Sequence, residues 1–182
     1  MEWRRPDDDE MAGYFIRYSN LVQEADIIAV LKEAKKTSRK LMFSLSFDEW
    51  DYRYAEDKWS VKEVWLHIID TERIFAYRAL RFGRGDQTPL SGFEQNNYIS
   101  PSKAPERSIA SIIHEYETVR DATISLFEYM PPEALDRTGT ASGNKLSARA
   151  LAFIIAGHER HHVNGLLVNY GVRVEGSVSR IS

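Results

Sequence analysis

The sequence predicts an all-α protein: a four-helix bundle with a short extra helix near its N-terminus and a long connection between the second and third bundle helices. Two observations carry this prediction. Four long stretches repeat apolar residues at helical spacing, and no run of alternating apolar and polar residues competes with them. The 182 residues suffice for a single hydrophobic core. We therefore expect one domain that spans residues 1–182.

The first two bundle helices are marked by their start and stop signals. The apolar pattern of the first covers about residues 26–45. The second opens at Ser60, because its hydroxyl and the carboxylate of Glu63 can form a capping box, and it stops at Gly83. Before both, the aromatic segment AGYFIRYSNLV (12–22) predicts a short extra helix packed on the bundle.

The last two bundle helices are bounded by proline and glycine. The third covers about residues 105–130, since Pro105 is acceptable in a first helical turn and Pro131 cannot continue a helix. The fourth runs from about Ser147 to about Tyr170, just before a glycine suited to a C-terminal cap. The segment TGTASGNKL that precedes the fourth helix is a turn cluster.

The connection between the second and third helices, GRGDQTPLSGFEQNNYISPSKAP (83–105), is longer than a bundle requires. Connections of this length often carry function or move. The plainer interpretation is a crossover that joins two helices that are not neighbours. The residue pattern alone leaves both interpretations open.

The composition excludes several classes of function. Hydrophobic residues make up 43% of the chain and charged residues 28%, as in ordinary folded proteins. The net charge is −3, so we expect no nucleic-acid partner. The absence of cysteine excludes disulfides, thiolate metal ligands and a cysteine nucleophile. The acidic run at residues 7–10 is interpreted as a solvated tail.

No stretch of the sequence reads as a secretory leader, and no apolar run is long enough to span a bilayer. Together with the absence of cysteine, this predicts a cytoplasmic protein that does not contact a membrane. A small-molecule substrate is then the expected partner.

Two of the five histidines fall on the inward face of the last helix. His158 and His162 are four residues apart, in the same stripe as Ile154 and Ile155. Imidazoles at this spacing can reach one metal ion. Gly165, on the same stripe, leaves space beside them. These positions predict two metal ligands inside the bundle.

A third ligand is expected from the second helix. His67 lies with Thr71 at the edge of that helix's apolar stripe, where it can face a neighbouring helix. A single buried histidine is more often a hydrogen-bonded core residue, but three from two helices favour a metal site. His161 is expected at the rim of this site. His114, opposite the apolar stripe of its helix, is expected to be exposed and without a role.

Two charged residues interrupt the apolar stripes of the middle helices. Glu72 lies among apolar positions of the second helix and Arg120 among those of the third. A charge at a core-facing position needs a partner or a ligand. Either the two pair as a structural bridge, or they line a cavity beside the metal, where Arg120 could hold an anionic group. Together with Glu159 they are the candidate catalytic residues, and Asp70 is a further candidate base.

The stretch HERHH (158–162) also contains H-E-x-x-H, the signature of zinc proteases. Such enzymes need a third ligand downstream. Here Val168 occupies the position where one form has histidine, and only Glu175 follows as a candidate from the other form. Glu159 is also expected about 100° around the helix from His158, toward the flank of the stripe. We therefore interpret the protease match as incidental.

Two motifs, W-[ST]-x-x-E-x-x-x-H and H-x-x-x-H, occur together in KWSVKEVWLHIIDTERIFAYRALRF (58–82) and ALAFIIAGHERHHVNGLL (150–167). With RRPDDDEMAGYFIRYSNLV near the start and LSGFEQNNYIS in the long connection, they resemble the DinB-like superfamily. Within it, they resemble the YfiT-type metal-dependent hydrolases. The resemblance covers nearly the whole chain, and the paired motifs are fairly specific.

The resemblance implies a bundle with up-down-down-up connectivity, which makes the long connection a crossover. It implies a divalent metal ion, usually zinc or nickel, bound by three histidines that correspond to His67, His158 and His162. It also implies a homodimer, since members of the family often dimerise. Characterised members include S-transferases that use bacillithiol, glutathione or mycothiol, and a maleylpyruvate isomerase.

Three neutral imidazoles leave an open position on the ion, and two chemistries follow. One is hydrolysis by an activated water. The other is transfer of an external low-molecular-weight thiol, such as bacillithiol or glutathione, whose carboxylates or sugar Arg120, Asn96 and Asn97 could hold. The alternative is a non-catalytic metal-binding or interaction module with a vestigial site. A cavity that reaches the metal position would favour an enzyme over the module.

Overall fold

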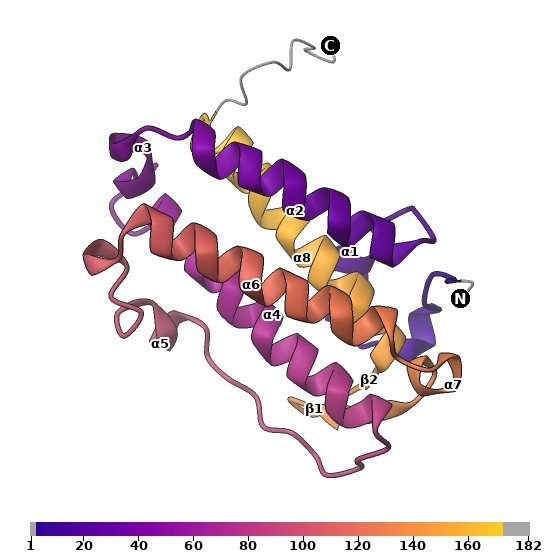
Figure 1. Ribbon diagram of the computed structural model, residues 1–182. Coiled ribbons are helices and arrows are strands. Elements are labelled where there is room, and N and C mark those ends of the chain that lie inside the picture. The colour runs from indigo at the N-terminus through magenta and orange to yellow at the C-terminus, as the bar shows by residue number, and fades with distance from the viewer. Residues whose placement is uncertain (1–2, 173–182) are drawn as a thin grey trace.

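Four long helices form the frame of the protein (Figure 1). In the computed structural model, which describes residues 3–172, these helices are α2 (Ile27–Ser44), α4 (Val61–Gly83), α6 (Ile109–Glu128) and α8 (Ala148–Val168). They form a ring in which α4 packs against α6 and α8, and α2 packs against the same two helices. Helices α2 and α8 run in one direction and α4 and α6 in the other. The predicted four-helix bundle with up-down-down-up connectivity is confirmed.

The long connection is a crossover. Because α4 and α6 run in the same direction, the chain between them must return along the length of the bundle, as Figure 1 shows. This segment, residues 84–108, is called the strap below. It contains the short helices α5 (Asn96–Ile99) and η2 (Ala104–Glu106). Pro105 lies in η2 rather than in the first turn of the third bundle helix, because Ser108 caps α6 by accepting a hydrogen bond from the Ser111 amide (3.2 Å).

The capping box predicted at Ser60 is present, whereas the predicted C-terminal glycine, Gly171, lies beyond Asn169, the residue that caps the end of α8. The Ser60 amide donates to the Glu63 carboxylate (2.6 Å) and the Glu63 amide donates to the Ser60 hydroxyl (3.3 Å), which completes the capping box at the start of α4. Asp26 and Ser147 accept hydrogen bonds from the first turns of α2 and α8. The boundaries predicted from the sequence are therefore close to the observed ones.

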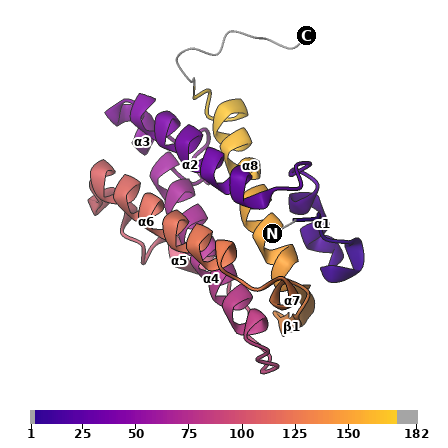
Figure 2. The ribbon, with the colours of Figure 1, turned by 45° about the vertical axis from the view of Figure 1, so that its right-hand side comes forward.

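Short elements surround the bundle. They are η1 (Asp8–Glu10), α1 (Gly13–Ser19), α3 (Phe47–Asp51) and α7 (Pro132–Leu135). Helix α1 is the extra helix expected within residues 12–22, and it packs along α8 (Figure 2). Gly157 permits this close approach, because a Cβ atom there would lie 1.9 Å from the Tyr18 carbonyl oxygen.

The structure corrects one prediction, since the turn cluster before the fourth helix belongs to a β-hairpin. Strands β1 (Thr138–Ala141) and β2 (Asn144–Ser147) pair antiparallel. Ser142 and Gly143 join them with φ values of 52° and 74°, as a two-residue type I′ turn requires. Strands of four residues are too short to show an alternating pattern. The hairpin anchors the strap, because the Leu90 amide donates to the Thr140 carbonyl (2.9 Å).

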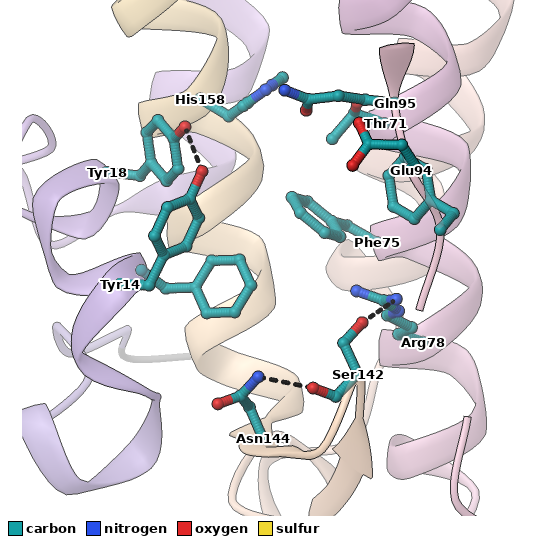
Figure 3. A pocket seen from close by; sticks show the side chains of 12 residues that line it. Tyr14, Tyr18, Thr71, Phe75, Arg78, Glu94, Gln95, Ser142, Asn144 and His158 are labelled. Atoms are coloured by element: carbon teal, nitrogen blue, oxygen red, sulfur yellow. Dashed lines mark hydrogen bonds between the residues drawn. The ribbon is translucent and has the colours of Figure 1, made fainter. Parts of the chain in front are cut away.

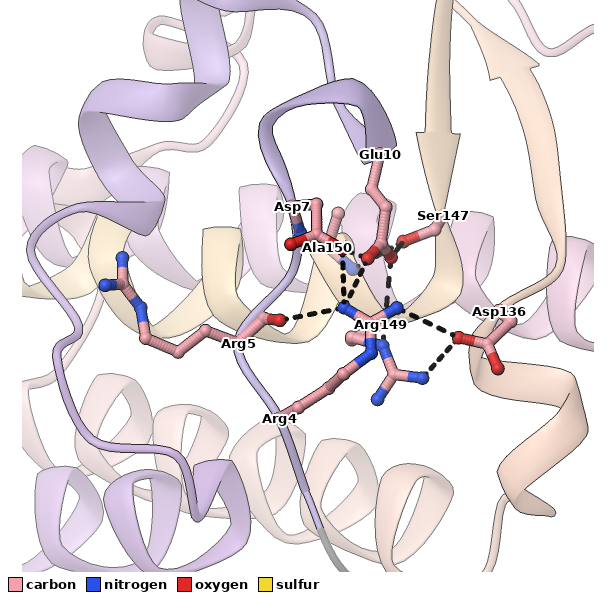
Figure 4. A network of polar contacts seen from close by, with 8 residues as sticks. All are labelled: Arg4, Arg5, Asp7, Glu10, Asp136, Ser147, Arg149 and Ala150. Atoms are coloured by element: carbon pink, nitrogen blue, oxygen red, sulfur yellow. Dashed lines mark hydrogen bonds and ion pairs between the residues drawn. The ribbon is translucent and has the colours of Figure 1, made fainter.

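The acidic run at residues 7–10 is not a solvated tail throughout, because Glu10 joins a polar network (Figure 4). Its carboxylate accepts from the Ser147 hydroxyl at the start of α8 (2.7 Å) and pairs with Arg4 (2.8 Å). Arg149, which is buried, pairs with Asp136 and lies 3.8 Å from Glu10. This network fixes the N-terminal segment to the base of α8, and therefore fixes α1 beside the bundle.

The apolar core has two parts along the bundle. One is built around Leu151, Phe153 and Ile154 of α8, and the other around Trp50, Trp65 and Tyr116. Both consist of side chains that are almost completely excluded from solvent. Within residues 3–172, no helix combines the length and the hydropathy needed to cross a membrane.

Candidate metal centre

Three histidines converge in the bundle interior, and they are called the histidine cluster. His67 comes from α4, and His158 and His162 come from successive turns of α8. The Nε2 atom of His158 lies 3.1 Å from the Nε2 atom of His67 and 3.1 Å from that of His162. One nitrogen from each ring lies within 4.8 Å of the other two. The structure therefore brings together the three residues predicted from the sequence.

The spacing of these nitrogens fits a single divalent cation. Two nitrogens that are each about 2.0–2.1 Å from one ion are about 2.9 Å apart at a right angle and about 3.4 Å apart at a tetrahedral angle. The observed 3.1 Å lies between these values. Hydrogen bonding does not explain the arrangement as well, because the Nε2 atom of His158 has one lone pair or one hydrogen and faces two other nitrogens.

Burial keeps the three imidazoles in the neutral form that binds metals. It lowers the pKa of His67 to about 4. Burial and the neighbouring His67 lower the pKa of His162 to about 3. The pKa of His158 is well below its usual value for the same reasons. Neutral imidazole is the ligand form, so no proton has to be displaced at neutral pH.

Neighbouring side chains hold the rings in place. The Thr71 hydroxyl lies 3.4 Å from His67 Nδ1, the nitrogen that faces away from the cluster. A partner at that nitrogen fixes the ring and its tautomer. Trp59 packs on His67 with ring centroids 4.8 Å apart, and Tyr18 of α1 packs on His158 at 5.3 Å. Three separate elements therefore restrict the motion of the cluster.

A second polar group lies in the interior beside the histidines, and it is called the Arg120 cluster. Its members come from all four bundle helices: Ser38, Glu72, Tyr116, Arg120 and Glu159. Arg120 donates to both oxygens of Glu72 (2.8 and 2.7 Å) and lies 2.6 Å from a Glu159 oxygen. The other Glu159 oxygen accepts from Tyr116 (2.5 Å) and Ser38 (2.6 Å).

The electrostatics of the Arg120 cluster are those of a closed ion network. Arg120 has an exposed fraction of 0%, and Glu72 and Glu159 are almost as buried. Burial alone would lower the pKa of Arg120, but the attraction of Glu159 and Glu72 outweighs it and raises that pKa well above its usual value. Burial and Glu159 raise the pKa of Tyr116. Tyr116 therefore remains a proton donor to the carboxylate.

These contacts show where the candidate catalytic residues lie. The pairing of Glu72 with Arg120 agrees with the structural bridge, one of the two interpretations of these charges. The expectation that Glu159 lies toward the flank of its helix stripe was wrong, since it is buried against α2 and α6. Its carboxylate contacts Arg120, Tyr116 and Ser38 and not the histidines, which agrees with the interpretation that the protease match is incidental. None of the three residues lines either of the two cavities described next.

Two cavities meet the histidine cluster from different sides. One, of about 330 Å³, is called the Arg78 cavity and reaches His158 (Figure 3). The other, of about 380 Å³, is called the Trp59 cavity and reaches His162. The strap contributes to both, since residues 93–95 line the Arg78 cavity and Asn96 lines the Trp59 cavity. Both volumes fall in the range of small-molecule sites.

The family follows from comparison with known proteins. A model of the DinB superfamily matches residues 31–165, well over half of the chain. The chain belongs to the DinB superfamily. The solved structure of YfiT from Bacillus subtilis, described as a probable metal-dependent hydrolase with an unusual four-helix bundle topology, superimposes with a TM-score of 0.71 at 14% identity. The match covers 84% of this chain and 91% of YfiT.

Two further proteins are similar in sequence. The uncharacterized protein YjoA of Bacillus subtilis is 23% identical, with 81% of this chain and 89% of YjoA covered. Its crystal structure gives a TM-score of 0.58. A protein of Oceanobacillus iheyensis named "Putative metal-dependent hydrolase OB0413" is 25% identical, with 76% of this chain and 82% of that protein covered. These likenesses agree with the resemblance seen in the motifs.

The remaining predicted residues of this DinB-superfamily protein have distinct positions. His161 lines the Trp59 cavity beside the histidine cluster, as a rim residue would. His114 is exposed, as expected. Asn96 lines the Trp59 cavity, whereas Asn97 lines neither cavity. Asp70 is half-buried, and burial raises its pKa.

The sequence reasoning missed Arg78, the charged residue that lines a cavity in place of Arg120. Arg78 lies on α4 in the same stripe as His67. Thr71, Phe75 and Arg78 follow that histidine by four, eight and eleven residues. This spacing marks one face of a helix. The helical spacing therefore places Arg78 on the same face as His67, but about three turns of the helix away from it.

Proposed function

We propose that the protein is a metal-dependent enzyme whose divalent ion, zinc or nickel, is held by His67, His158 and His162. The observation that carries the proposal is the convergence of three neutral imidazole nitrogens, two from buried histidines and one from a half-buried one, with a cavity reaching His158 and another reaching His162. Three protein ligands leave at least one coordination position for a substrate, as in catalytic sites. The names of OB0413 and YfiT support hydrolysis as the reaction.

The ion supplies Lewis-acid chemistry when bound, since it polarises a substrate oxygen and lowers the pKa of a coordinated water or thiol. The protein's own residues keep the site rigid and partly closed. The Arg120 cluster joins α2, α4, α6 and α8, so it fixes the distance between His67 on one helix and His158 on another. Gln95 of the strap points toward His158 (Figure 3), so its amide lies at the end of the Arg78 cavity that this histidine lines.

A second candidate function is thiol S-transfer, and the two separate cavities favour it. A thiol could enter from one cavity and an electrophile from the other, with both reaching the histidine cluster. The thiol would lose its proton, and its sulfur would form a bond to the electrophilic carbon as the leaving group departs. Because the chain has no cysteine, the sulfur must come from an external thiol such as bacillithiol or glutathione.

The same cavities count against a non-catalytic module. A vestigial site would be expected to collapse or to be filled by side chains. Here each cavity ends at a histidine of the cluster, and Gly165 adds no side chain to the wall of the Trp59 cavity, because a Cβ atom there would meet nothing within 4 Å. Open access to the ligand nitrogens supports an enzyme.

The test is a substrate panel with metal-loaded protein. One arm offers activated esters and amides without thiol. The other offers bacillithiol, glutathione or cysteine together with monochlorobimane. We expect turnover that disappears with EDTA and in His158→Asn, but persists in His114→Asn. Ester or amide cleavage without thiol would establish the hydrolase, and conjugate formation that requires thiol would establish the transferase. Turnover that survives in His158→Asn would contradict the proposal.

A further inference from the structure

Arg78 is a buried cation without an acidic partner. Only four cationic side chains are buried within residues 3–172: Lys62, Arg78, Arg120 and Arg149. The other three pair with carboxylates. Within the same residues, no carboxylate oxygen lies within 4.0 Å of the Arg78 guanidinium, and burial lowers its pKa with no acid to oppose the shift. A buried charge of this kind normally has a counter-ion.

The contacts of Arg78 orient it without neutralising it. One terminal nitrogen, Nη2, donates to the Ser142 hydroxyl (2.9 Å) and to the Ser91 carbonyl (3.2 Å). The rings of Phe75 and Phe93 lie 5.6 and 5.8 Å from the guanidinium carbon. Nε and Nη1 make no hydrogen bond to protein atoms of residues 3–172. The hairpin and the strap thus hold Arg78 in position and leave donors for a ligand.

The cavity in front of Arg78 has aromatic walls and a polar end. Tyr14 and Tyr18 of α1 face Phe75 of α4 across it, while Ser142 and Asn144 of the hairpin lie near Arg78 (Figure 3). Phe15 also lines the cavity and packs edge-on against Phe75, with ring centroids 5.9 Å apart. Such walls fit an apolar or aromatic body, since rings contribute contact area without needing hydrogen bonds.

The other charges around the cavity do not cancel Arg78. Glu94 also lines it, but its carboxylate accepts from the backbone and side-chain amides of Asn96 (3.1 and 3.0 Å) and is directed toward α5. On the opposite wall, Arg17 donates to the hydroxyls of Tyr14 (2.6 Å) and Tyr18 (2.7 Å). A second positive charge is therefore held by the tyrosines of the wall, which favours an anion in the cavity.

Arg78 also lies at a defined separation from the histidine cluster. It follows His67 by eleven residues on α4, which corresponds to about 16 Å along the helix axis. His158 lines the opposite end of the same cavity. An elongated ligand that fills this cavity can therefore lie with one end toward His158 and the other on Arg78.

We infer that the Arg78 cavity binds an organic anion, with an aromatic or apolar body between the tyrosines and Phe75 and a carboxylate or phosphate on Arg78. The further step, that this anion is a substrate which reacts at the histidine cluster, rests on the proposed function. Binding itself needs no metal, so the two ideas can fail separately.

The experiment measures binding to metal-free protein in EDTA by isothermal titration calorimetry. The probes are 3-phenylpropionate and phenyl phosphate, and the neutral match is 3-phenylpropanamide. We expect at least one anion to bind wild-type protein at least tenfold more tightly than the amide. Arg78→Gln should reduce this preference to less than twofold, and Arg78→Lys should keep part of it. Arg84→Gln, an exposed arginine at the end of the same helix, is the control and should keep all of it.

Several results would overturn the inference. The first is that neither anion binds wild-type protein more tightly than the amide does. A result in which no probe binds up to its solubility limit counts as this outcome. Alternatively, Arg78→Gln keeps the wild-type preference, or Arg84→Gln loses it equally. The wild-type comparison decides the matter even if Arg78→Gln does not fold, which circular dichroism checks. If the anion preference disappears in Arg78→Gln but the protein shows no metal-dependent turnover, this inference stands and the proposed function is contradicted. If turnover is found but wild-type protein shows no anion preference, the proposed function stands and this inference is contradicted.

Discussion

His158 and Glu159 are consecutive on α8, yet they belong to two polar centres of different kinds. The Arg120 cluster supplies its own counter-charges. Within it, Arg120 Nη1 and Glu159 Oε2 lack a hydrogen bond, but Glu159 Oε2 lies 2.6 Å from the Arg120 guanidinium as an ion pair. The histidine cluster brings three acceptors together and supplies no cation. Both are buried in the same bundle. Burial therefore does not separate the two centres. They differ because one contains its own counter-charges, whereas the other groups three neutral nitrogens that can bind a metal ion.

The largest expected effect comes from opening the Arg120 cluster. Arg120→Met leaves Glu72 and Glu159 buried without their cation, so we expect a loss of about 3–5 kcal/mol in the free energy of unfolding. Urea denaturation measures it. Arg39→Met, which removes a surface ion pair with Glu117, is the control and should cost less than about 1 kcal/mol. Equal effects for the two variants would show that the cluster does not brace the bundle.

A smaller effect is expected when a divalent cation is added to the protein. Zinc or nickel at about 100 times its dissociation constant should stabilise the wild-type protein by about 2.7 kcal/mol. His158→Asn should lose this gain, because two nitrogens remain where three are needed. Thermal unfolding with and without metal measures it, and His114→Asn, which changes an exposed histidine, should behave as wild type. An undiminished gain in His158→Asn would place the metal elsewhere.

The smallest expected effect is the loss of folding stability when the pH falls by one unit, because protons bind the same histidine nitrogens. Burial lowers the folded-state pKa of His67 to about 4 and that of His162 to about 3, from 6.5. The unfolded chain therefore binds more protons below pH 6.5, and the metal-free protein loses stability as the pH falls from 7 toward 4. Between pH 7 and pH 6 the loss is on the order of 1 kcal/mol.

Chemical denaturation in EDTA at several pH values measures this loss. The double variant His67→Asn/His162→Asn has two fewer such groups to protonate and keeps only His158, so its stability should change less over the same interval. A slope that is identical in both proteins would mean that other groups cause the acid sensitivity. The carboxylates of the Arg120 cluster would then be the expected cause, since the buried Glu159 of α8 is one of them.

The sequence predicts most of the fold because long helices leave long patterns. The capping box at Ser60 and the glycine at residue 83 locate α4 closely, and the three histidines follow from helical spacing alone. The hairpin was missed because two strands of four residues have no measurable period. It matters for the site, since it carries Ser142 and the anchor of the strap.

The parts of the site that sequence could not supply depend on contacts between helices. Whether Arg120 or Arg78 faces a cavity is decided by which one meets carboxylates from other helices, and that is a tertiary property. The position of Glu159 follows the same rule, because Tyr116 and Ser38 approach it from α6 and α2. Spacing along one helix gives the face of a residue but not its partner.

The most direct test of the central claim is X-ray anomalous scattering at the absorption edge of the bound metal, on crystals grown from protein purified without chelator. The account predicts one strong peak about 2.0–2.1 Å from the Nε2 atoms of His67, His158 and His162, and no peak at the Arg120 cluster. A peak bound by other residues, or none after soaking with zinc and with nickel, would contradict it.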